Sequence, residues 1–225
     1  MVRLIEQRRN GDTIDQGLVK KVVNSFVSLG LDESNINKAS LVVHKEHFEI
    51  AFLDSTGKYY KLESESFLAQ SSISHYLRKA RDWLCEEEDL MERYLNAETR
   101  KASISKCEYI LIHEHSQSMW ECFQNLLDCD KDEDLQCIYA LLSRISEGLE
   151  PLWKKFEERV KKAGLAAVSN LIGEGGANIN VDSLDPMAYL NALLEVQTVT
   201  RSFRSEAGFM ASLDIAYREF VITMP

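Results

Sequence analysis

The sequence predicts an all-α protein built from two packed helical bundles. Only 3 Pro and 10 Gly occur in 225 residues, so regular elements are rarely interrupted. Hydrophobic residues make up 45% of the chain, which is enough for one large core or two smaller ones. They recur at helical spacing in successive segments, and no convincing β pattern appears between them. Long helices joined by short polar turns are typical of antiparallel bundles.

The first half of the chain shows a series of amphipathic helices. They are expected over Val2–Arg9, Asp15–Leu29, Leu41–Phe52 with a continuation to Leu68, a segment of about 24 residues after Ser72, and Glu98–Ile112. The second of these should bury Leu18, Val22, Val23, Phe26 and Leu29, and the fourth Tyr76, Ala80, Trp83, Leu84, Met91, Tyr94 and Leu95. Gly57 is expected to bend or end the third helix, and Ser71-Ser72 to cap the fourth. Residues 86–89 should partly face water.

The second half continues the pattern. Helices are expected over Met119–Leu127, Leu135–Ile145, Leu149–Ile172, a segment opened by Asp185-Pro186, and Ala207–Val221. Their buried faces should include Leu135, Ile138, Leu141, Leu142, Ile145, Leu152, Phe156, Val160, Leu165, Val168, Ile172, Tyr189, Leu193, Val196, Phe203, Phe209 and Leu213. A loop rich in Gly and Asn is expected over 173–182. With roughly ten helices in all, two domains are predicted, 1–114 and 115–225.

Charge and cysteine usage exclude several classes of protein. The formal net charge is −10, and neither half of the chain has the basic excess that nucleic acid attracts. The five cysteines are odd in number and form no Cys-X-X-Cys pair, which favours reduced thiols in a cytoplasmic and nuclear protein. No apolar run approaches the roughly 20 residues of a membrane span, so no membrane association is expected.

The acidic run between the two central helices matches a calcium loop only in part. Asp128, Asp130, Asp132 and Asp134 alternate as calcium ligands do. The sixth position of such a loop requires Gly and the twelfth a bidentate Glu, whereas Glu133 and Tyr139 stand there. The run is therefore interpreted as an acidic turn that favours the N-terminus of the following helix.

The remaining candidate sites also lack the pattern that their chemistry needs. His113 and His115 are two residues apart and would point to different sides of a helix, while His44 and His47 have no third ligand nearby. Cys107 and Cys122 lie among apolar residues and are interpreted as small core groups. The glycine-rich run 173–176 lacks a Lys-Ser/Thr ending, and the basic residues of 154–162 alternate with Glu. No catalytic residue, metal or cofactor is therefore predicted.

Several runs, in matching order along nearly the whole chain, resemble one family. They are LIEQRRNG at 4–11, YLRKA at 76–80, FQNLLD at 123–128, KDEDL at 131–135, YALLSRI at 139–145, GL at 148–149, GLAAV at 164–168 and AGFMASLD at 207–214. This order of motifs resembles the cullin family, and within it the branch that scaffolds SCF-type ubiquitin ligases. The resemblance covers the second and third of the three five-helix repeats that form the elongated N-terminal arm of cullins.

The resemblance implies a function in ubiquitin-dependent protein degradation. In cullins the first repeat binds the adaptor that carries the substrate receptor. The C-terminal region binds the RING-box protein and carries the lysine modified by NEDD8. Both lie outside the resemblance, so no residue of this chain is assigned to those partners, and a cullin-associated exchange factor along the arm is a further expected partner. The start within a helix and the tail Ile222–Pro225, which departs from the expected Asn-rich continuation, predict a fragment.

The expected function is thus that of a non-catalytic rigid scaffold segment. It would space the substrate-adaptor end of a ligase from its RING end. The alternative is a generic helical-bundle interaction or tethering module unrelated to ubiquitin. A cysteine- or metal-dependent enzyme is a third class, which metal analysis and thiol reactivity would test.

Overall fold

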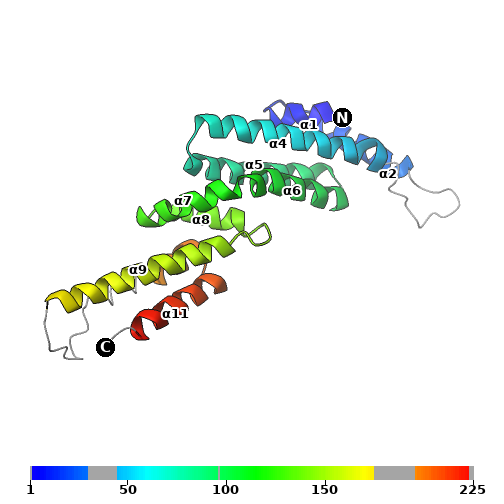
Figure 1. The fold of residues 1–225 in the computed structure, drawn as a ribbon. Helices are drawn as coiled ribbons and strands as arrows, with labels where there is room; N and C mark the ends of the chain where they lie inside the picture. Colours follow the sequence, from blue (N-terminus) through cyan, green and yellow to red (C-terminus); the bar gives the residue numbers. More distant parts are fainter. Residues whose placement is uncertain (1, 30–44, 96, 175–195, 223–225) are drawn as a thin grey trace, which may run out of the picture. The chain divides into compact units, whose positions relative to one another are not determined.

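The computed structural model describes residues 2–29, 45–95, 97–174 and 196–222, and within these ranges it contains helices and no strand (Figure 1). The all-α prediction is confirmed. By its internal contacts the chain divides into two compact units, Met1–His115 and Ser116–Pro225. The assignment of residues 1–114 and 115–225 to a second and a third cullin repeat stays a prediction.

The first unit consists of helices whose bounds lie close to those expected. They are α1 (Val2–Arg9), α2 (Gln16–Leu29), the π-helix η1 (Lys45–Glu49), α4 (Ile50–Gln70), α5 (Ile73–Tyr94), α6 (Ala97–Leu111) and the short 3-10 helix η2 (His113–His115). Ser72 caps α5 as predicted, because its side chain accepts a hydrogen bond from the backbone N–H of His75. Residues 41–44 of the expected third helix lie outside the described residues.

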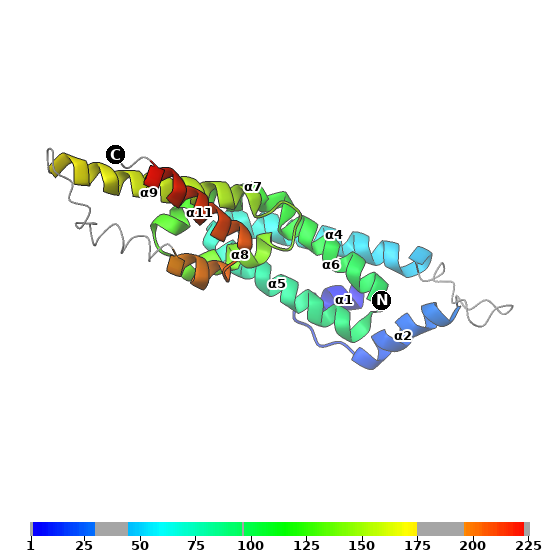
Figure 2. The same ribbon diagram turned by 90° about the horizontal axis from the view of Figure 1, so that it is seen from below.

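Long helices lie side by side in this unit (Figures 1 and 2). Glu49 of η1, just before α4, bonds Thr99 of α6, and Ser64 of α4 contacts His115 of η2, just after α6, so α4 and α6 run parallel. α5 runs antiparallel to α4, since Phe67 of α4 lies near Tyr76 at the start of α5 and the earlier Tyr60 lies near Glu87. Each long helix therefore contacts another over most of its length.

Gly57 does not bend or end its helix, which corrects the prediction. α4 runs through Gly57, and this glycine is buried. A Cβ built there would lie 2.9 Å from Cε of Lys106 and 3.5 Å from Cδ1 of Ile110, both on α6. The missing side chain thus lets α6 come close to α4, and this packing outweighs the weak helix propensity of glycine.

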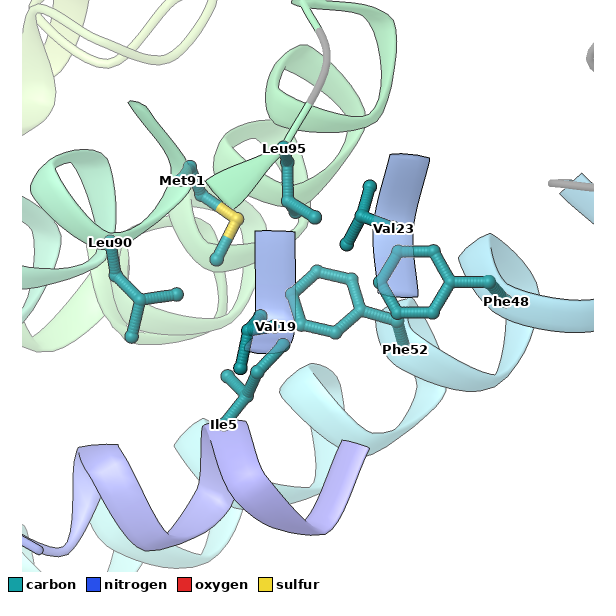
Figure 3. Packing of buried hydrophobic residues seen from close by; sticks show 8 residues of the cluster. All are labelled: Ile5, Val19, Val23, Phe48, Phe52, Leu90, Met91 and Leu95. Atoms are coloured by element: carbon teal, nitrogen blue, oxygen red, sulfur yellow. The ribbon is translucent and has the colours of Figure 1, made fainter. Parts of the chain in front are cut away.

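One hydrophobic core of the first unit gathers residues from α1, α2, η1, α4, α5 and the C-cap of α5. It consists of Ile5, Val19, Val23, Phe48, Phe52, Leu90, Met91 and Leu95 (Figure 3). The rings of Phe48 and Phe52 stack with centroids 5.4 Å apart. Leu18, predicted to be buried, is 49% exposed, because the buried edge of α2 runs through Val19 and Val23. The side chains of Phe26, Leu29 and Tyr94 lie outside the described residues.

Within its described residues the second unit contains five helical segments. They are α7 (Ser116–Asp128), α8 (Asp132–Leu142), α9 (Glu150–Glu174), a helical segment over 196–203, and α11 (Ala207–Ile222). α9 and α11 run parallel, since Trp153 contacts Glu206 at one end and Lys161 contacts Glu219 further along. The predicted loop beyond 174 and the helix opened by Asp185-Pro186, with Tyr189 and Leu193, lie outside the described residues.

Aromatic side chains fill the core of the second unit. They are Phe123, Tyr139, Phe156, Phe203 and Phe209. The rings of Phe203 and Phe209 stack with centroids 3.9 Å apart and an interplanar angle of 10°. Leu165 is 45% exposed, contrary to prediction. It follows Val160 by five residues, about 140° around the helix, and so leaves the buried stripe of α9.

The start of α11 is fixed by a contact that tolerates only glycine. Glu206 Oε2 accepts the indole N–H of Trp153 at 3.0 Å and the backbone N–H of Phe209 at 3.1 Å. A Cβ built on Gly208 would lie 2.1 Å from Cε2 of this indole. The rigid ring therefore occupies the space that a side chain at Gly208 would need.

We expect opposite results from the same substitution at two helical glycines. Gly208→Ala should lower the free energy of unfolding by about 1–3 kcal/mol, because the indole must leave its site. Gly57→Ala should be neutral or stabilise by up to about 1 kcal/mol, because the flexible Lys106 side chain can move and alanine favours helix. Urea denaturation of both variants measures this difference. An equal loss of unfolding free energy in the two variants would contradict the difference in packing described for Gly208 and Gly57.

Candidate functional site

A buried charge centre lies in the first unit, where α1 meets α4 and α5. Arg9 comes from the last turn of α1, Thr56 and Tyr60 from α4, and Glu87 from α5. The side chains of Arg9 and Glu87 are only 3% and 1% exposed. Charges buried to this extent must be paired, since removal from water is unfavourable.

The pairing is bidentate. Arg9 Nη2 lies 2.5 Å from Glu87 Oε1, and Arg9 Nε donates to Glu87 Oε2 at 3.0 Å. The Tyr60 hydroxyl donates to Glu87 Oε2 at 2.8 Å, and Arg9 Nη2 also donates to the Thr56 hydroxyl at 2.8 Å. This fork geometry is the strong form of a carboxylate–guanidinium contact and fixes three helices relative to one another.

Aromatic rings surround the guanidinium. Its central carbon lies 5.6 Å from the ring centroid of Phe52, 5.4 Å from that of Tyr59 and 5.5 Å from that of Tyr60. At these distances the electron-rich ring faces attract a cation, most strongly where water is excluded. The rings thus offset part of the cost of burying the arginine.

The protonation states of the centre follow from its burial and its charges. Burial alone would lower the pKa of Arg9, but the charge and the hydrogen bonds of Glu87 outweigh it and the pKa is raised. Burial, followed by the Glu87 charge, raises the pKa of Tyr60 far above its ordinary value. Arg9 therefore stays charged and Tyr60 stays a neutral donor at physiological pH.

A cavity of about 280 Å³ adjoins the centre, lined in part by Tyr59, Trp83 and Arg93. The nearby thiol of Cys107 is buried, and burial together with the Glu87 charge raises its pKa, so it is not a thiolate nucleophile. What the arrangement does is to join α1 firmly to α4 and α5. It is a structural joint rather than a reactive site.

Sequence reasoning missed this centre, although one signal was present. Glu87 lies on the same face of α5 as Ala80, Trp83, Leu84 and Met91, which are all buried as predicted. A charged residue on an apolar stripe indicates a buried partner. The prediction that 86–89 partly face water holds for Glu86 and Asp89 but is wrong for Glu87.

The acidic run lies where a helix begins. Asp132, Glu133 and Asp134 form the first turn of α8, the position in which carboxylates are favoured by the helix dipole. Asp132 accepts a hydrogen bond from Ser202, and Asp128 accepts one from Arg159. Among the described residues, no three His, Cys, Asp or Glu side chains gather as a metal site.

The two histidines of η2 diverge, as predicted. His113 stacks on Tyr109 of α6, with centroids 4.9 Å apart. His115 instead contacts Ser64 and the ring of Tyr76. His47 is exposed, and its predicted neighbour His44 lies outside the described residues.

The cysteines differ in burial, and all five are free thiols. Cys107 and Cys137 are buried, Cys122 is half-buried, and Cys85 and Cys129 are exposed. Burial raises the pKa of Cys122 to about 11. The prediction that Cys107 is a core group is confirmed.

The basic residues of α9 make intramolecular contacts. Lys161 lies 2.7 Å from Glu157 on its own helix and 2.7 Å from Glu219 on α11. Lys155 donates to the backbone carbonyl of Trp120 at 2.6 Å.

The glycine-rich run 173–176 lies partly outside the described residues. Within the part of the chain that the structure describes, no helix is both long and apolar enough to span a bilayer.

Comparison with known proteins decides the family. The profile described as the Cullin alpha solenoid domain matches residues 1–224. The chain belongs to the cullin family. The resemblance expected from the sequence is confirmed.

Three relatives with the name Cullin-1 match 98% of this cullin chain. Identity is 40% to the protein of Dictyostelium discoideum, 34% to that of Schizosaccharomyces pombe and 32% to that of Caenorhabditis elegans. The matched part is 28%, 29% and 29% of the respective relative. The cullin chain thus spans less than a third of the length of these relatives.

Proposed function

We propose that this cullin chain is a non-catalytic scaffold segment of a cullin-RING ubiquitin ligase. Its task is to hold the substrate-adaptor end and the RING end of the ligase at a fixed separation. The observation that carries this proposal is the family match over 1–224, together with 40% identity to a Cullin-1 across 98% of the chain. We further propose that it acts in the cytoplasm and the nucleus.

The packing within each unit supports a spacing function. Close-packed helices transmit strain instead of absorbing it, and a spacer needs this stiffness. In the first unit the Arg9–Glu87 pair joins three helices, and in the second unit the Trp153–Glu206 contact fixes α11 on α9. The Arg9–Glu87 pair is buried and the Trp153–Glu206 contact is part-buried, so both can stiffen their units while most of the surface stays available to partners.

The partners proposed are proteins of the ligase. The adaptor and the RING-box protein would bind parts of the longer protein outside this segment. A cullin-associated exchange factor would contact the arm itself. With both ends held by the scaffold, the effective concentration of substrate at the ubiquitin-charged enzyme depends on the geometry of the segment.

A segment exchange tests this proposal. Residues 1–224 of this chain would replace the matched part of Dictyostelium discoideum Cullin-1, and the chimera would be reconstituted with adaptor, substrate receptor, RING-box protein and charged ubiquitin-conjugating enzyme. We expect ubiquitin transfer to the substrate at a rate within about tenfold of the unmodified Cullin-1. A folded chimera that binds both end partners without transferring ubiquitin would refute the spacing function. Transfer undiminished after deletion of the segment would refute it as well.

A further inference from the structure

An asparagine–glycine pair ends α1. Gly11 has a φ of +93°, in the left-handed region that glycine occupies without strain. Its backbone N–H donates to the Arg8 carbonyl at 3.1 Å. The backbone N–H of Asp12 donates to the Gln7 carbonyl at 2.9 Å. These two hydrogen bonds form a Schellman motif, in which Asn10 is the last residue before the left-handed glycine.

Both residues of the pair lie open to solvent. Asn10 and Gly11 are exposed, and a Cβ built on Gly11 would have no heavy atom from beyond the neighbouring residues within 4 Å. Glycine has no side chain to hinder the approach of another group to its backbone nitrogen. No other asparagine in the sequence is followed by glycine. Asn10 is therefore the asparagine whose side-chain amide is best placed to react with the nitrogen that follows it.

The reaction open to this pair is closure of a ring within the chain. The Gly11 nitrogen, after losing its proton to solvent, attacks Cγ of Asn10. The N–Cγ bond forms, the Cγ–Nδ2 bond breaks, and Nδ2 takes up a proton and leaves as ammonia. The resulting succinimide then adds one water molecule from the solvent. Ring opening at Cγ gives aspartate, whereas opening at the main-chain carbonyl carbon gives isoaspartate, in which the chain runs through the side chain. No oxidant or reductant takes part.

We propose that Asn10-Gly11 is a modification site, at which deamidation to isoaspartate detaches the end of α1 from α4 and α5. The product carries a negative charge at the C-terminus of α1, where the helix dipole disfavours it. Isoaspartate also lengthens the main chain before Gly11, so the Schellman hydrogen bonds cannot both form. Arg9 is the last residue of α1, so its buried pair with Glu87 is the contact next to the change. This site belongs to the first unit alone and does not depend on the proposed ligase function.

The end of α1 controls the rate of the reaction. The Gly11 N–H must leave the Arg8 carbonyl before its nitrogen can attack, so the reaction requires a local opening of the helix end. The Arg9–Glu87 pair opposes this opening because it holds the last turn of α1 on α5. Conversion should therefore be slower in the folded chain than in the unfolded chain, and it should rise with pH as more of the Gly11 nitrogen loses its proton.

Asn125 is the internal comparison. It lies inside α7, and its side-chain oxygen accepts a hydrogen bond from the Cys129 thiol at 3.2 Å. The following residue is Leu126, whose side chain hinders ring closure and whose N–H lies in the interior of a helix. Because a helix end opens far more readily than a helix interior, Asn10 should convert at least about tenfold faster than Asn125.

Ageing of the native 225-residue chain at physiological temperature tests the site. Peptide mapping by mass spectrometry measures the conversion of Asn10 and Asn125. Methylation by an isoaspartyl methyltransferase, with S-adenosylmethionine as the methyl donor, distinguishes isoaspartate from aspartate. We expect isoaspartate in place of Asn10, intact Asn125, and a lower urea midpoint for the converted fraction than for the unconverted one. The chain unfolded in urea gives the upper limit of the rate.

Variants separate this reaction from general ageing. Asn10→Gln keeps an exposed amide but requires a six-membered ring, so neither the isoaspartate nor the fall of the urea midpoint should develop. Arg9→Met should speed conversion of Asn10 at least about threefold, because the last turn of α1 opens more often. Thr56→Val, which removes only one partner of the guanidinium, should act in the same direction if Arg9→Met does not fold. Arg3→Met, at an exposed residue of α1, is the matched control and should leave the rate unchanged.

Three results would overturn the proposal. The first is a native chain that keeps Asn10 intact over a period in which the urea-unfolded chain forms isoaspartate. The second is conversion of Asn10 no faster than that of Asn125. The third is a converted fraction with the same urea midpoint as the unconverted chain, which would show that isoaspartate does not detach α1.

Discussion

Arg9→Met is expected to lower the free energy of unfolding by about 3–5 kcal/mol, the range found when one partner of a buried ion pair is removed. The methionine fills much of the volume, but Glu87 is left 1% exposed without its counter-ion. Tyr60 alone cannot stabilise this carboxylate. Urea denaturation followed by circular dichroism measures the loss. The control is Arg8→Met on the exposed side of α1, which should stay within about 0.5 kcal/mol of the original chain.

A second substitution distinguishes the ion pair from simple loss of packing. Glu87→Leu alone should also destabilise, since it leaves the Arg9 guanidinium unpaired. In the double variant Arg9→Met/Glu87→Leu neither charge remains. Its loss of unfolding free energy should therefore be smaller than the sum of the two single losses by more than about 1 kcal/mol. Strict additivity of the two single effects would show that the pair does not act as a unit.

Phe156→Asp is expected to unfold the second unit, with a loss of more than about 4 kcal/mol, because it buries an unpaired charge and removes an aromatic ring. Phe156 is fully buried and packs against both Phe203 and Phe209. Leu142→Asp, at another fully buried site, should act in the same way. Thermal unfolding of the isolated chain gives the size of the effect.

The same substitution links stability to the proposed function. In the Cullin-1 chimera, Phe156→Asp should slow ubiquitin transfer while the adaptor and the RING-box protein still bind, because the proposed function places their binding sites outside this segment. Leu165→Asp is the matched control on α9, where the original leucine is already 45% exposed. It should leave both the melting temperature and the transfer rate nearly unchanged. Loss of transfer in the control alone would instead indicate a contact surface at Leu165.

Local patterns in the sequence predicted the helices well. α1 has the expected bounds, and α2 and α6 begin within one residue of theirs, because apolar periodicity and capping residues act over a few positions. The errors arose where distant packing decides. Gly57 stays helical because α6 lies against it, and which edge of α2 is buried depends on α5.

The buried charge centre shows the limit of such reasoning most clearly. Arg9 bonds Thr56, 47 positions away, and Glu87, 78 positions away. No periodicity in a single helix connects residues so far apart. Only the position of Glu87 on an apolar face pointed to a partner, and it did not say which of the 26 basic residues that partner is.

The parallel register of α4 and α6 has a mechanical consequence. Three contacts of different chemistry hold the η1–α4 segment against the α6–η2 segment, near both ends and in the middle. They are Glu49 with Thr99, Gly57 with Lys106, and Ser64 with His115. Sliding one helix by a single turn, about 5.4 Å, would break all three at once and place each residue opposite an unsuitable neighbour. A pull along the helix axes therefore loads these contacts together in shear, so the first unit should resist stretching far better than it resists peeling from one side.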